Sequence, residues 1–351
     1  MSSKPSDSAI GTGPLGLTLV QLEDWCTSRE LPRFRAKQIF HQFHQRLLGD
    51  FGAASDLPKA LREDLQQSFG AIRQLEVVQQ REAEDGTRKL ALQAADGASF
   101  ETVLIPMDGP FTQCLSSQSG CAMGCTFCYT GASGVGRNLT AAEILEQHYR
   151  GLELCEGNLR NLVFMGMGEP MQNLDEVLAA CRLLMDPEGR AMSPTRLTVS
   201  TCGVVPGIKR LGREAPGVRL AVSLNAADDE TRSKLMPINK RYNLETLKAT
   251  LKAHPLSPRD RLTFEYIMLA GVNDRQTDAR NLLRFLDGLL CKLNLIPFNE
   301  VPALPFKSSP MERIHWFQDL LKSKGIPVTI RASKGRDIMA ACGQLARTSP
   351  R

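Results

Sequence analysis

Seven apolar runs with strand character alternate with helical runs from about residue 111 onward, and this alternation constrains the fold more than any other feature. In chain order the strand runs are TQCLSS, NLVFMGM, RLTVS, VRLAVSL, LTFEYIML, KLNLIPF and PVTIRA. The helical run TAAEILEQHYRGLEL opens with Thr140 and Glu143 at the spacing of a capping box. Strands separated by helices predict parallel βα units, as a barrel or an open sheet, with chemistry at the C-terminal strand ends.

The first part of the chain has a different pattern. Residues 1–16 are polar and expected to be disordered, and residues 17–72 carry three segments with apolar residues recurring at three and four. These segments are LTLVQLEDWCTSREL, FRAKQIFHQFHQRLL and PKALREDLQQSF. Residues 73–110 contain DG pairs and the alternating runs RKLALQA and FETVLIP, which predict a β-hairpin extension. Residues 111–347 then form the α/β core, and residues 348–351 a tail.

Composition narrows the class of protein. Apolar residues make up 42% and charged residues 23% of the 351 residues, as in an ordinary globular protein. The N-terminus lacks the apolar run of a signal peptide, and no stretch reaches the roughly 18 apolar residues of a membrane span. The expected location is therefore the cytoplasm. The net charge of +5 does not identify a partner. Five basic residues form a local stripe near the N-terminus: Arg29, Arg33, Arg35, Lys37 and Arg46. Such a stripe is explained equally well by contacts with phosphates and by a solvated helix face.

Three of the ten cysteines lie within eight residues, in GCAMGCTFCYTG. Cys121, Cys125 and Cys128 have the spacing Cys-x3-Cys-x2-Cys, whereas a structural zinc site takes four ligands, usually as two separated pairs. Iron–sulfur clusters take cysteine thiolates, and a cubane held by three of them leaves one iron open. A zinc site with Cys114 as its fourth ligand is the alternative. Four scattered thiols among apolar neighbours are expected in the core: Cys26, Cys155, Cys181 and Cys291.

These residues carry a family resemblance. The CxxxCxxC run resembles the signature of the radical S-adenosylmethionine (SAM) superfamily, and QCLSSQSGCAMGCTFCYTG resembles the RlmN/Cfr family of RNA methyltransferases. The likeness continues in the same order through FMGMGEP, STCGVVP, SLNAADDETRSKLMPINKRYN, LIPFN and DIMAACGQLA, and it includes FRAKQI near the N-terminus. The resemblance covers about residues 17–347. It implies a partial (β/α)6 radical SAM barrel, a helical RNA-binding accessory domain, and a [4Fe–4S] cluster on the three cysteines.

The implied reaction forms 2-methyladenosine in 23S rRNA and in tRNA, at the position 3′ of the anticodon. C2 of adenine lies between two ring nitrogens and is electron-poor, so it cannot attack the methyl group of SAM as a nucleophile. A carbon radical that adds to the ring is therefore needed. By resemblance, Cys342 accepts a methyl group from one SAM, and the radical from a second SAM removes hydrogen from that methyl. Cys114 matches the thiol that releases the product and leaves a Cys114–Cys342 disulfide. Glu101 matches the proton acceptor.

The same resemblance assigns the SAM contacts. Glycine permits close backbone approach, and a carboxylate can receive the ammonium of SAM. The matching residues lie at strand ends: Gly168, Glu169, Ser200, Ser223, Leu224, Asn225 and Asn299. Loop capping is the alternative role of the serines. Asn225 departs from the histidine of many members, which matters only if the contact is made through the ring. The run GASGVG at 131–136 lacks the spacing of a dinucleotide loop.

Recognition of RNA is less readable. The target base must leave its stack, which is easiest in an unpaired loop. Candidates for phosphate contacts are Arg33, Arg35, Lys37, Lys234, Lys240 and Arg241. The resemblance further implies an electron donor such as flavodoxin or ferredoxin, and a monomer. Two alternatives stay open: Cfr-type methylation at C8 of the same rRNA adenine, and a zinc-stabilised RNA-binding protein without catalysis.

Overall fold

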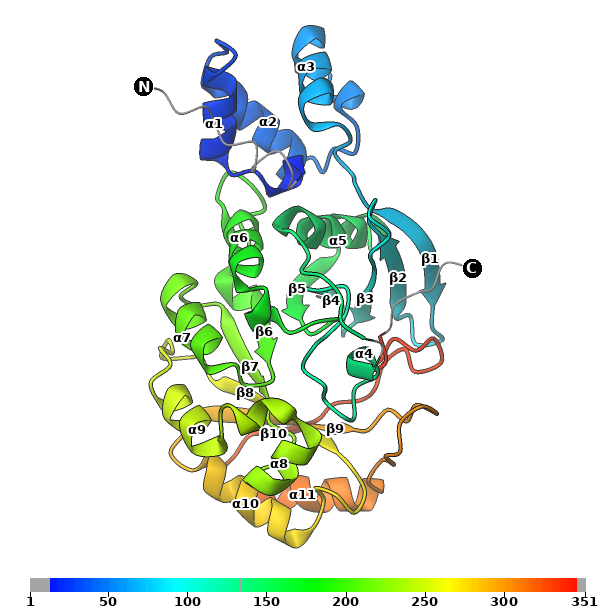
Figure 1. The fold of residues 1–351 in the computed structure, drawn as a ribbon, viewed down its shortest axis with the longest axis vertical. Coiled ribbons are helices and arrows are strands. Elements are labelled where there is room, and N and C mark those ends of the chain that lie inside the picture. Colours follow the sequence, from blue (N-terminus) through cyan, green and yellow to red (C-terminus); the bar gives the residue numbers. More distant parts are fainter. Residues whose placement is uncertain (1–12, 133, 346–351) are drawn as a thin grey trace.

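The computed structural model describes residues 13–132 and 134–345, which form one ten-stranded sheet flanked by helices (Figure 1). The strands lie across the sheet in chain order. They are β1 (Glu76–Glu82), β2 (Arg88–Gln93), β3 (Ser99–Pro106), β4 (Phe111–Cys114), β5 (Leu159–Phe164), β6 (Leu197–Thr201), β7 (Arg219–Ser223), β8 (Leu262–Met268), β9 (Cys291–Pro297) and β10 (Val328–Ile330). Strands β1 to β4 are antiparallel, and β4 to β10 are parallel.

The parallel part is the predicted partial barrel. Among the described residues no ladder joins β1 to β10, so the sheet stays open. Central strands such as β8 are buried along almost their whole length, which explains their continuous apolar sequence. The flanking helices are α4 (Tyr129–Ala132), α5 (Ala141–Leu154), α6 (Leu174–Met185), α7 (Val205–Glu214), α8 (Asp229–Leu235), α9 (Leu244–Lys252), α10 (Gln276–Leu286) and α11 (Met311–Ser323).

Helix α5 begins where its sequence predicts. The Thr140 side chain accepts a hydrogen bond from the Glu143 amide, and the Glu143 carboxylate accepts one from the Thr140 amide. Because this capping box pairs two amides that the helix itself leaves unpaired, it stabilises the start of the helix by about 1 kcal/mol. Short 3₁₀ helices complete the connections: η2 (Pro14–Gly16), η3 (Phe51–Ala53), η4 (Pro170–Gln172), η5 (Pro194–Arg196) and η6 (Pro237–Lys240).

The three predicted N-terminal helices are α1 (Leu19–Thr27), α2 (Phe34–His44) and α3 (Lys59–Phe69). The first two end earlier than the apolar pattern suggests. Glu30 has φ 56° and Leu47 has φ 55°, and these left-handed conformations cannot continue an α-helix. Residues 1–12 lie outside the described part, as does the tail at 348–351. Pro14–Gly16, within the segment expected to be disordered, instead pack against α5 and α6.

The β extension belongs to the same sheet as the barrel. Strand β3 pairs antiparallel with β2 on one side and with β4 on the other, so β1 to β3 continue the barrel sheet beyond its first parallel strand. One large apolar core runs from Leu15 to Leu345 and includes residues of the N-terminal helices, the extension and the barrel. The extension therefore positions residues next to the barrel rather than forming a separate unit.

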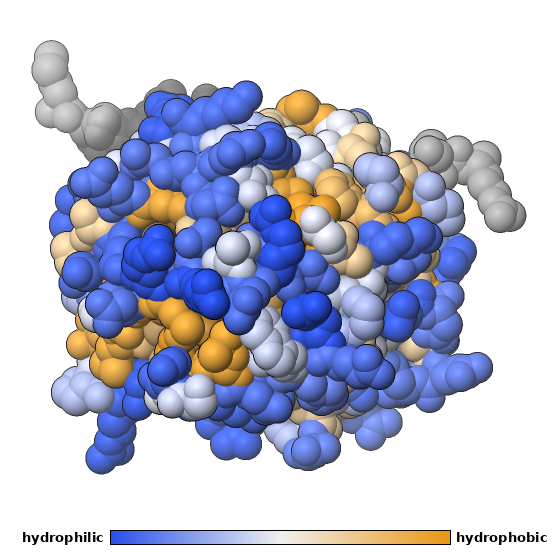
Figure 2. Space-filling view, turned by 90° about the horizontal axis from the view of Figure 1, so that it is seen from below, coloured by the Kyte–Doolittle hydropathy of each residue, from blue (hydrophilic) through white to orange (hydrophobic). Residues whose placement is uncertain are grey.

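The surface is mixed in character. Seen from below, most side chains are hydrophilic, and hydrophobic ones gather in limited patches between them (Figure 2). No helix within residues 13–132 and 134–345 is long and apolar enough to cross a membrane.

Candidate active site

The three clustered cysteines lie on the loop that follows β4. Its backbone is held from two sides: the Cys121 amide donates to Gly134 O at 3.3 Å, and the Tyr129 amide donates to Gly343 O at 2.8 Å. A Cβ on Gly120 would lie 2.5 Å from Gly134 O, so glycine is required for this close approach. The glycine-rich run after the cysteines therefore packs against the cysteine loop.

Cys121, Cys125 and Cys128 line one cavity of about 140 Å³ at the C-terminal ends of the parallel strands. Burial raises the pKa of Cys121 to about 11 and raises that of Cys125 as well, and the neighbouring thiols add to both shifts. These thiols are close enough to interact electrostatically, and a bound cationic cluster would favour their thiolate forms. No three His, Cys, Asp or Glu side chains in the described residues converge on a single ion. The set fits an iron–sulfur cluster, in which each thiolate would hold a different iron atom.

A fourth thiol, Cys202, also lines this cavity but is engaged elsewhere. Its amide donates to Glu169 Oε2 at 2.8 Å, and its side chain is hydrogen-bonded to the same carboxylate. Burial and the Glu169 charge raise the pKa of Cys202 well above its usual value. Cys202 is thus placed against Glu169, and it lies outside the Cys-x3-Cys-x2-Cys run whose three thiols would hold a cluster.

Glu169 and Gly168 form the turn after β5. The Glu169 carboxylate accepts the Met171 amide at 3.0 Å, which fixes it at the start of η4, and burial raises its pKa. Gly168 has φ 97°, and a Cβ there would lie 2.6 Å from Gln118 Cβ. Both residues line the smaller cavity, together with Ser200 from β6 and Ser223 from β7. These four expected SAM contacts are thus brought together by neighbouring strand ends.

Leu224 and Asn225 follow β7 and have structural roles there. Leu224 is fully buried and is absent from the cavity wall. Asn225 lines the cavity, but its Oδ1 accepts the Ile267 amide at 2.9 Å and its backbone carbonyl accepts Asn273 Nδ2 at 2.7 Å. Its φ of 56° is tolerated by asparagine better than by most residues. The side chain therefore joins the end of β7 to β8.

A buried arginine that sequence reasoning missed supports these strand ends. Arg232 donates from Nε to Leu224 O at 3.1 Å and from Nη2 to Cys202 O at 2.7 Å. Its Nη1 donates to Asn239 Oδ1 at 2.9 Å, so each guanidinium nitrogen has a partner. The guanidinium thereby ties the loop after β6 to the loop after β7, behind the smaller cavity. The burial of Arg232 and these three hydrogen bonds reveal a role that the sequence alone does not indicate.

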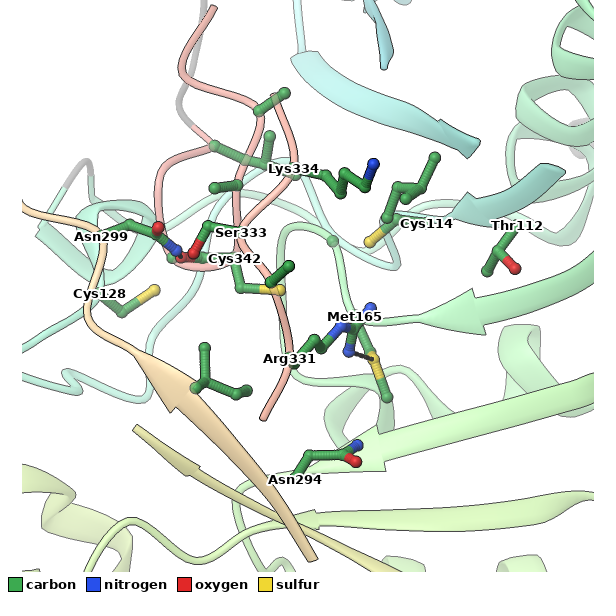
Figure 3. A pocket seen from close by; sticks show the side chains of 18 of the residues that line it. Thr112, Cys114, Cys128, Met165, Asn294, Asn299, Arg331, Ser333, Lys334 and Cys342 are labelled. Carbon is green, nitrogen blue, oxygen red and sulfur yellow. Dashed lines mark hydrogen bonds between the residues drawn. The ribbon is translucent and has the colours of Figure 1, made fainter. Parts of the chain in front are cut away.

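A larger cavity of about 470 Å³ adjoins the first. The two share Cys128, Met165, Gly166, Ile296, Cys342 and Gly343 in their walls. In Figure 3 the side chains of Cys114 and Cys342 point into the same space, with Arg331 beside it and Cys128 on the far side of Cys342. The structure thus gathers both thiols of the expected methyl transfer next to a cluster cysteine.

The two thiols are free in this structure; within the described residues no disulfide is present. Burial raises the pKa of Cys114 to about 12. Burial also raises the pKa of Cys342, and the positive charge of Arg331 acts against that rise. Arg331 follows β10, near the end of the run PVTIRA. Its position at a predicted strand end was the one sequence feature that could have marked it as a site residue.

Asn299 and Glu101 lie at the larger cavity and on β3, respectively. Asn299 lines the larger cavity; its Nδ2 donates to Cys342 O at 3.3 Å, and its buried Oδ1 has no hydrogen-bond partner among the described residues. A buried acceptor of this kind calls for a donor from a bound molecule. Glu101 is buried, with Oε1 2.9 Å from Lys89 Nζ.

Three of the six candidate RNA contacts are paired with carboxylates on the surface. Arg33 pairs with Glu23, Lys37 with Glu188 at 2.8 Å, and Lys234 with Glu230 at 2.7 Å. These pairs are solvent-exposed and therefore contribute little stability, so a phosphate can replace the carboxylate partner. Arg35 lies over the ring of the exposed Phe34, and Lys240 and Arg241 are also exposed.

Comparison with known proteins identifies the family. The Radical SAM superfamily matches residues 115–283, and the ribosomal RNA large subunit methyltransferase N-terminal domain matches residues 14–70. The dual-specificity RNA methyltransferase RlmN of Syntrophotalea carbinolica is 46% identical, covering 93% of this chain and 88% of that relative. The RlmN of Pelobacter propionicus is also 46% identical, covering 94% of each chain.

A solved structure agrees with this assignment. A radical SAM methyltransferase from Sphaerobacter thermophilus is 44% identical, with a TM-score of 0.91 over 95% of this chain and 99% of that one. The chain belongs to the RlmN family of radical SAM RNA methyltransferases.

Proposed function

We propose that this enzyme methylates C2 of adenine in 23S rRNA, and in tRNA at the position 3′ of the anticodon. The observation that carries the proposal is the shared cavity wall: Cys114 and Cys342 line one cavity, and Cys342 also lines the neighbouring cavity of the three clustered cysteines. A methyl carrier must visit SAM and then the base, and Cys342 is placed between the two spaces.

Cys121, Cys125 and Cys128 would hold a [4Fe–4S] cluster, and Gly168, Glu169, Ser200 and Ser223 would surround SAM. When bound, the cluster would supply the electron for cleavage of SAM and would serve as the one-electron acceptor for the adduct with the base. The chain's own part is to place the sulfonium, to exclude water and to carry the methyl group. The partnerless Asn299 Oδ1 is an acceptor available to a donor on SAM or on the base.

Cys342 would act twice in each turnover, which uses two SAM molecules. Its thiol first loses a proton and takes the methyl group of one SAM. Hydrogen removed from that methyl by the radical of a second SAM leaves a carbon radical, which adds to C2 and ties the enzyme to RNA.

Release of the methylated base would require Glu101 and Cys114. After the adduct has lost one electron, Glu101 would accept the C2 proton. The Cys114 thiolate would then attack the Cys342 sulfur, so that the carbon–sulfur bond breaks, its electron pair stays on carbon, and a proton completes the methyl group. The resulting Cys114–Cys342 disulfide is reduced by an external thiol.

We infer that residues 17–72 form an RNA-binding domain and that RNA approaches the larger cavity with the target base unstacked. The further elements of the proposal are an electron donor such as flavodoxin or ferredoxin, a monomeric enzyme and a location in the cytoplasm, where the RNA substrates are.

Mass spectrometry after anaerobic turnover tests the proposal. With SAM carrying a deuterated methyl group and a 23S rRNA fragment, we expect labelled 2-methyladenosine from the wild type and none from Cys342→Ala. Labelled 8-methyladenosine instead would establish C8 methylation. A colourless, zinc-loaded protein that binds RNA without modifying it would contradict the proposal.

A further inference from the structure

The turn between β1 and β2 is hydrogen-bonded to the segment that carries Cys342. The Glu84 amide donates to Asp337 Oδ2 at 3.2 Å, and Asp85 Oδ2 accepts the Gly335 amide at 3.0 Å. Neither contact was foreseeable from the sequence, because about 250 residues separate the partners. The extension is therefore in direct contact with the catalytic C-terminal segment.

Lys89, at the start of β2, adds a third and more buried contact. Its Nζ lies 3.1 Å from Met339 O and 2.9 Å from Glu101 Oε1. The side chains of Lys89 and Glu101 are only 7% and 6% exposed. Lysine is rarely buried to this degree without partners. One ammonium group thus holds the expected proton acceptor and a carbonyl three residues before Cys342.

Strand register explains why these groups meet. Lys89 pairs with Val103 across β2 and β3, and Val103 pairs with Cys114 across β3 and β4. Residues directly opposite one another share a face of the sheet, and so do residues two apart along a strand. Glu101, two residues before Val103, therefore shares its face with Lys89 and Cys114. The sheet brings the acceptor, its ammonium partner and the resolving thiol to one surface.

We propose that Lys89 is a positioning residue for product release: it holds the Glu101 carboxylate at a set distance from the loop that carries Cys342. This inference rests on the proposed function. In the step concerned, the C2 proton passes to Glu101 and the electron pair of the C–H bond returns to the adenine ring. Because a proton transfer needs its two heavy atoms within hydrogen-bond reach, a carboxylate that drifts away from the loop slows this step.

A purely structural ion pair would also be buried, so the test compares steps rather than activity alone. Lys89→Met removes the ammonium. Arg73→Met is the matched control, because the Arg73 side chain is also 7% exposed and its Nη2 also bonds one carboxylate, Glu153, and one carbonyl, that of Leu47. Lys89→Arg retains the charge, and Lys89→Gln serves if the methionine variant does not fold.

Two readouts are expected to separate the roles. In single turnover, Lys89→Met should methylate Cys342 as the wild type does, yet accumulate the covalent enzyme–RNA adduct and release product at least about tenfold more slowly. In the metal-free protein, hydrogen exchange over residues 333–343 should be faster in Lys89→Met than in the wild type. Arg73→Met should change neither readout, and Lys89→Arg should restore most of the release rate.

The outcome that overturns the inference is a Lys89→Met enzyme that releases product at the wild-type rate, or one that loses Cys342 methylation and release to the same extent. Glu101→Gln distinguishes this failure from failure of the proposed function. If Glu101→Gln accumulates adduct and Lys89→Met does not, Glu101 is the acceptor and Lys89 does not position it. If the wild type modifies no RNA, the proposed function itself is wrong.

Discussion

Arg331 and Glu265 form an ion pair that joins the two cavities: Arg331 Nη1 lies 3.1 Å from Glu265 Oε1. Arg331 lines the larger cavity and Glu265 the smaller one. The pKa of Arg331 is raised, above all by the electrostatic effect of Cys342, and burial raises the pKa of Glu265. The pair thus places a positive charge beside Cys342, the thiol proposed to receive the methyl group.

Replacement of Arg331 by methionine is therefore expected to make Cys342 less reactive. Burial already raises the pKa of this thiol, and loss of the opposing guanidinium raises it further. Alkylation of Cys342 by iodoacetamide in the metal-free protein, followed by mass spectrometry at fixed pH, should slow about tenfold for each added pKa unit. Arg331→Lys should stay close to the wild type; equal rates in the methionine variant would contradict the assigned influence.

Folding stability should fall on acidification because of two buried histidines. Burial, with a smaller effect of Arg190, lowers the pKa of His44 and of His148 to about 3. Their pKa in the unfolded chain is 6.5, so below that pH the unfolded state binds more protons than the folded state. The free energy of unfolding should therefore decrease as the pH falls from 6.5 towards 3, by on the order of a few kcal/mol.

Urea denaturation between pH 7 and pH 4 measures this decrease. His148→Gln, whose amide can retain the hydrogen bond to Gln113, should reduce the slope of stability against pH. His315→Gln is the matched control, because His315 is exposed and its replacement should leave this slope unchanged. A slope that is insensitive to His148 would mean that other groups cause the acid sensitivity.

Iron binding should depend on three cysteines and not on Cys202. Cys202→Ser should retain the iron content of the wild type after anaerobic reconstitution, because Cys202 is held at Glu169, whose negative charge disfavours a thiolate there. Cys125→Ala should lose the cluster. Iron analysis and the absorbance of the brown protein provide the measurement, and loss of iron in Cys202→Ser would identify it as a ligand.

Gly168→Ala should lose both stability and SAM affinity. Its φ of 97° disfavours any side chain, and the new Cβ would lie 2.6 Å from Gln118 Cβ. We expect a loss of about 2–4 kcal/mol, the sum of backbone strain and overpacking. Gly97→Ala is the control, because Gly97 has φ 83° but open space around it, and should lose only about 1–2 kcal/mol. Thermal unfolding and SAM titration distinguish the two; equal losses would exclude the contact with Gln118.

Charge reversal at the start of α2 should weaken RNA binding. Arg33→Glu with Lys37→Glu removes two phosphate contacts if both are made, so the slope of log affinity against log salt should fall by about 2, less for single-stranded segments. Binding titrations of a 23S rRNA fragment at several salt concentrations provide the measurement. An unchanged affinity and slope would remove this helix face from the RNA interface.

Much of the fold was readable from local pattern. Apolar runs predicted every parallel strand, because strands buried on both faces are continuously apolar, and the Thr140–Glu143 spacing located the start of α5. The predicted ends of α1 and α2 were wrong because Glu30 and Leu47 adopt left-handed conformations, and neither is a residue type that normally ends a helix. The cysteine spacing and the surrounding motifs led to the family that the comparisons show.

The sequence alone determined which residue types stand at the strand ends, since that depends on periodicity and spacing along the chain. Only the tertiary structure decided which of them meet. Lys89 reaches Glu101 and Met339, Arg331 reaches Glu265, and Cys202 is held by Glu169. These contacts link residues 12 to 250 positions apart, and strand register and loop packing, which no local pattern encodes, bring them within hydrogen-bond distance.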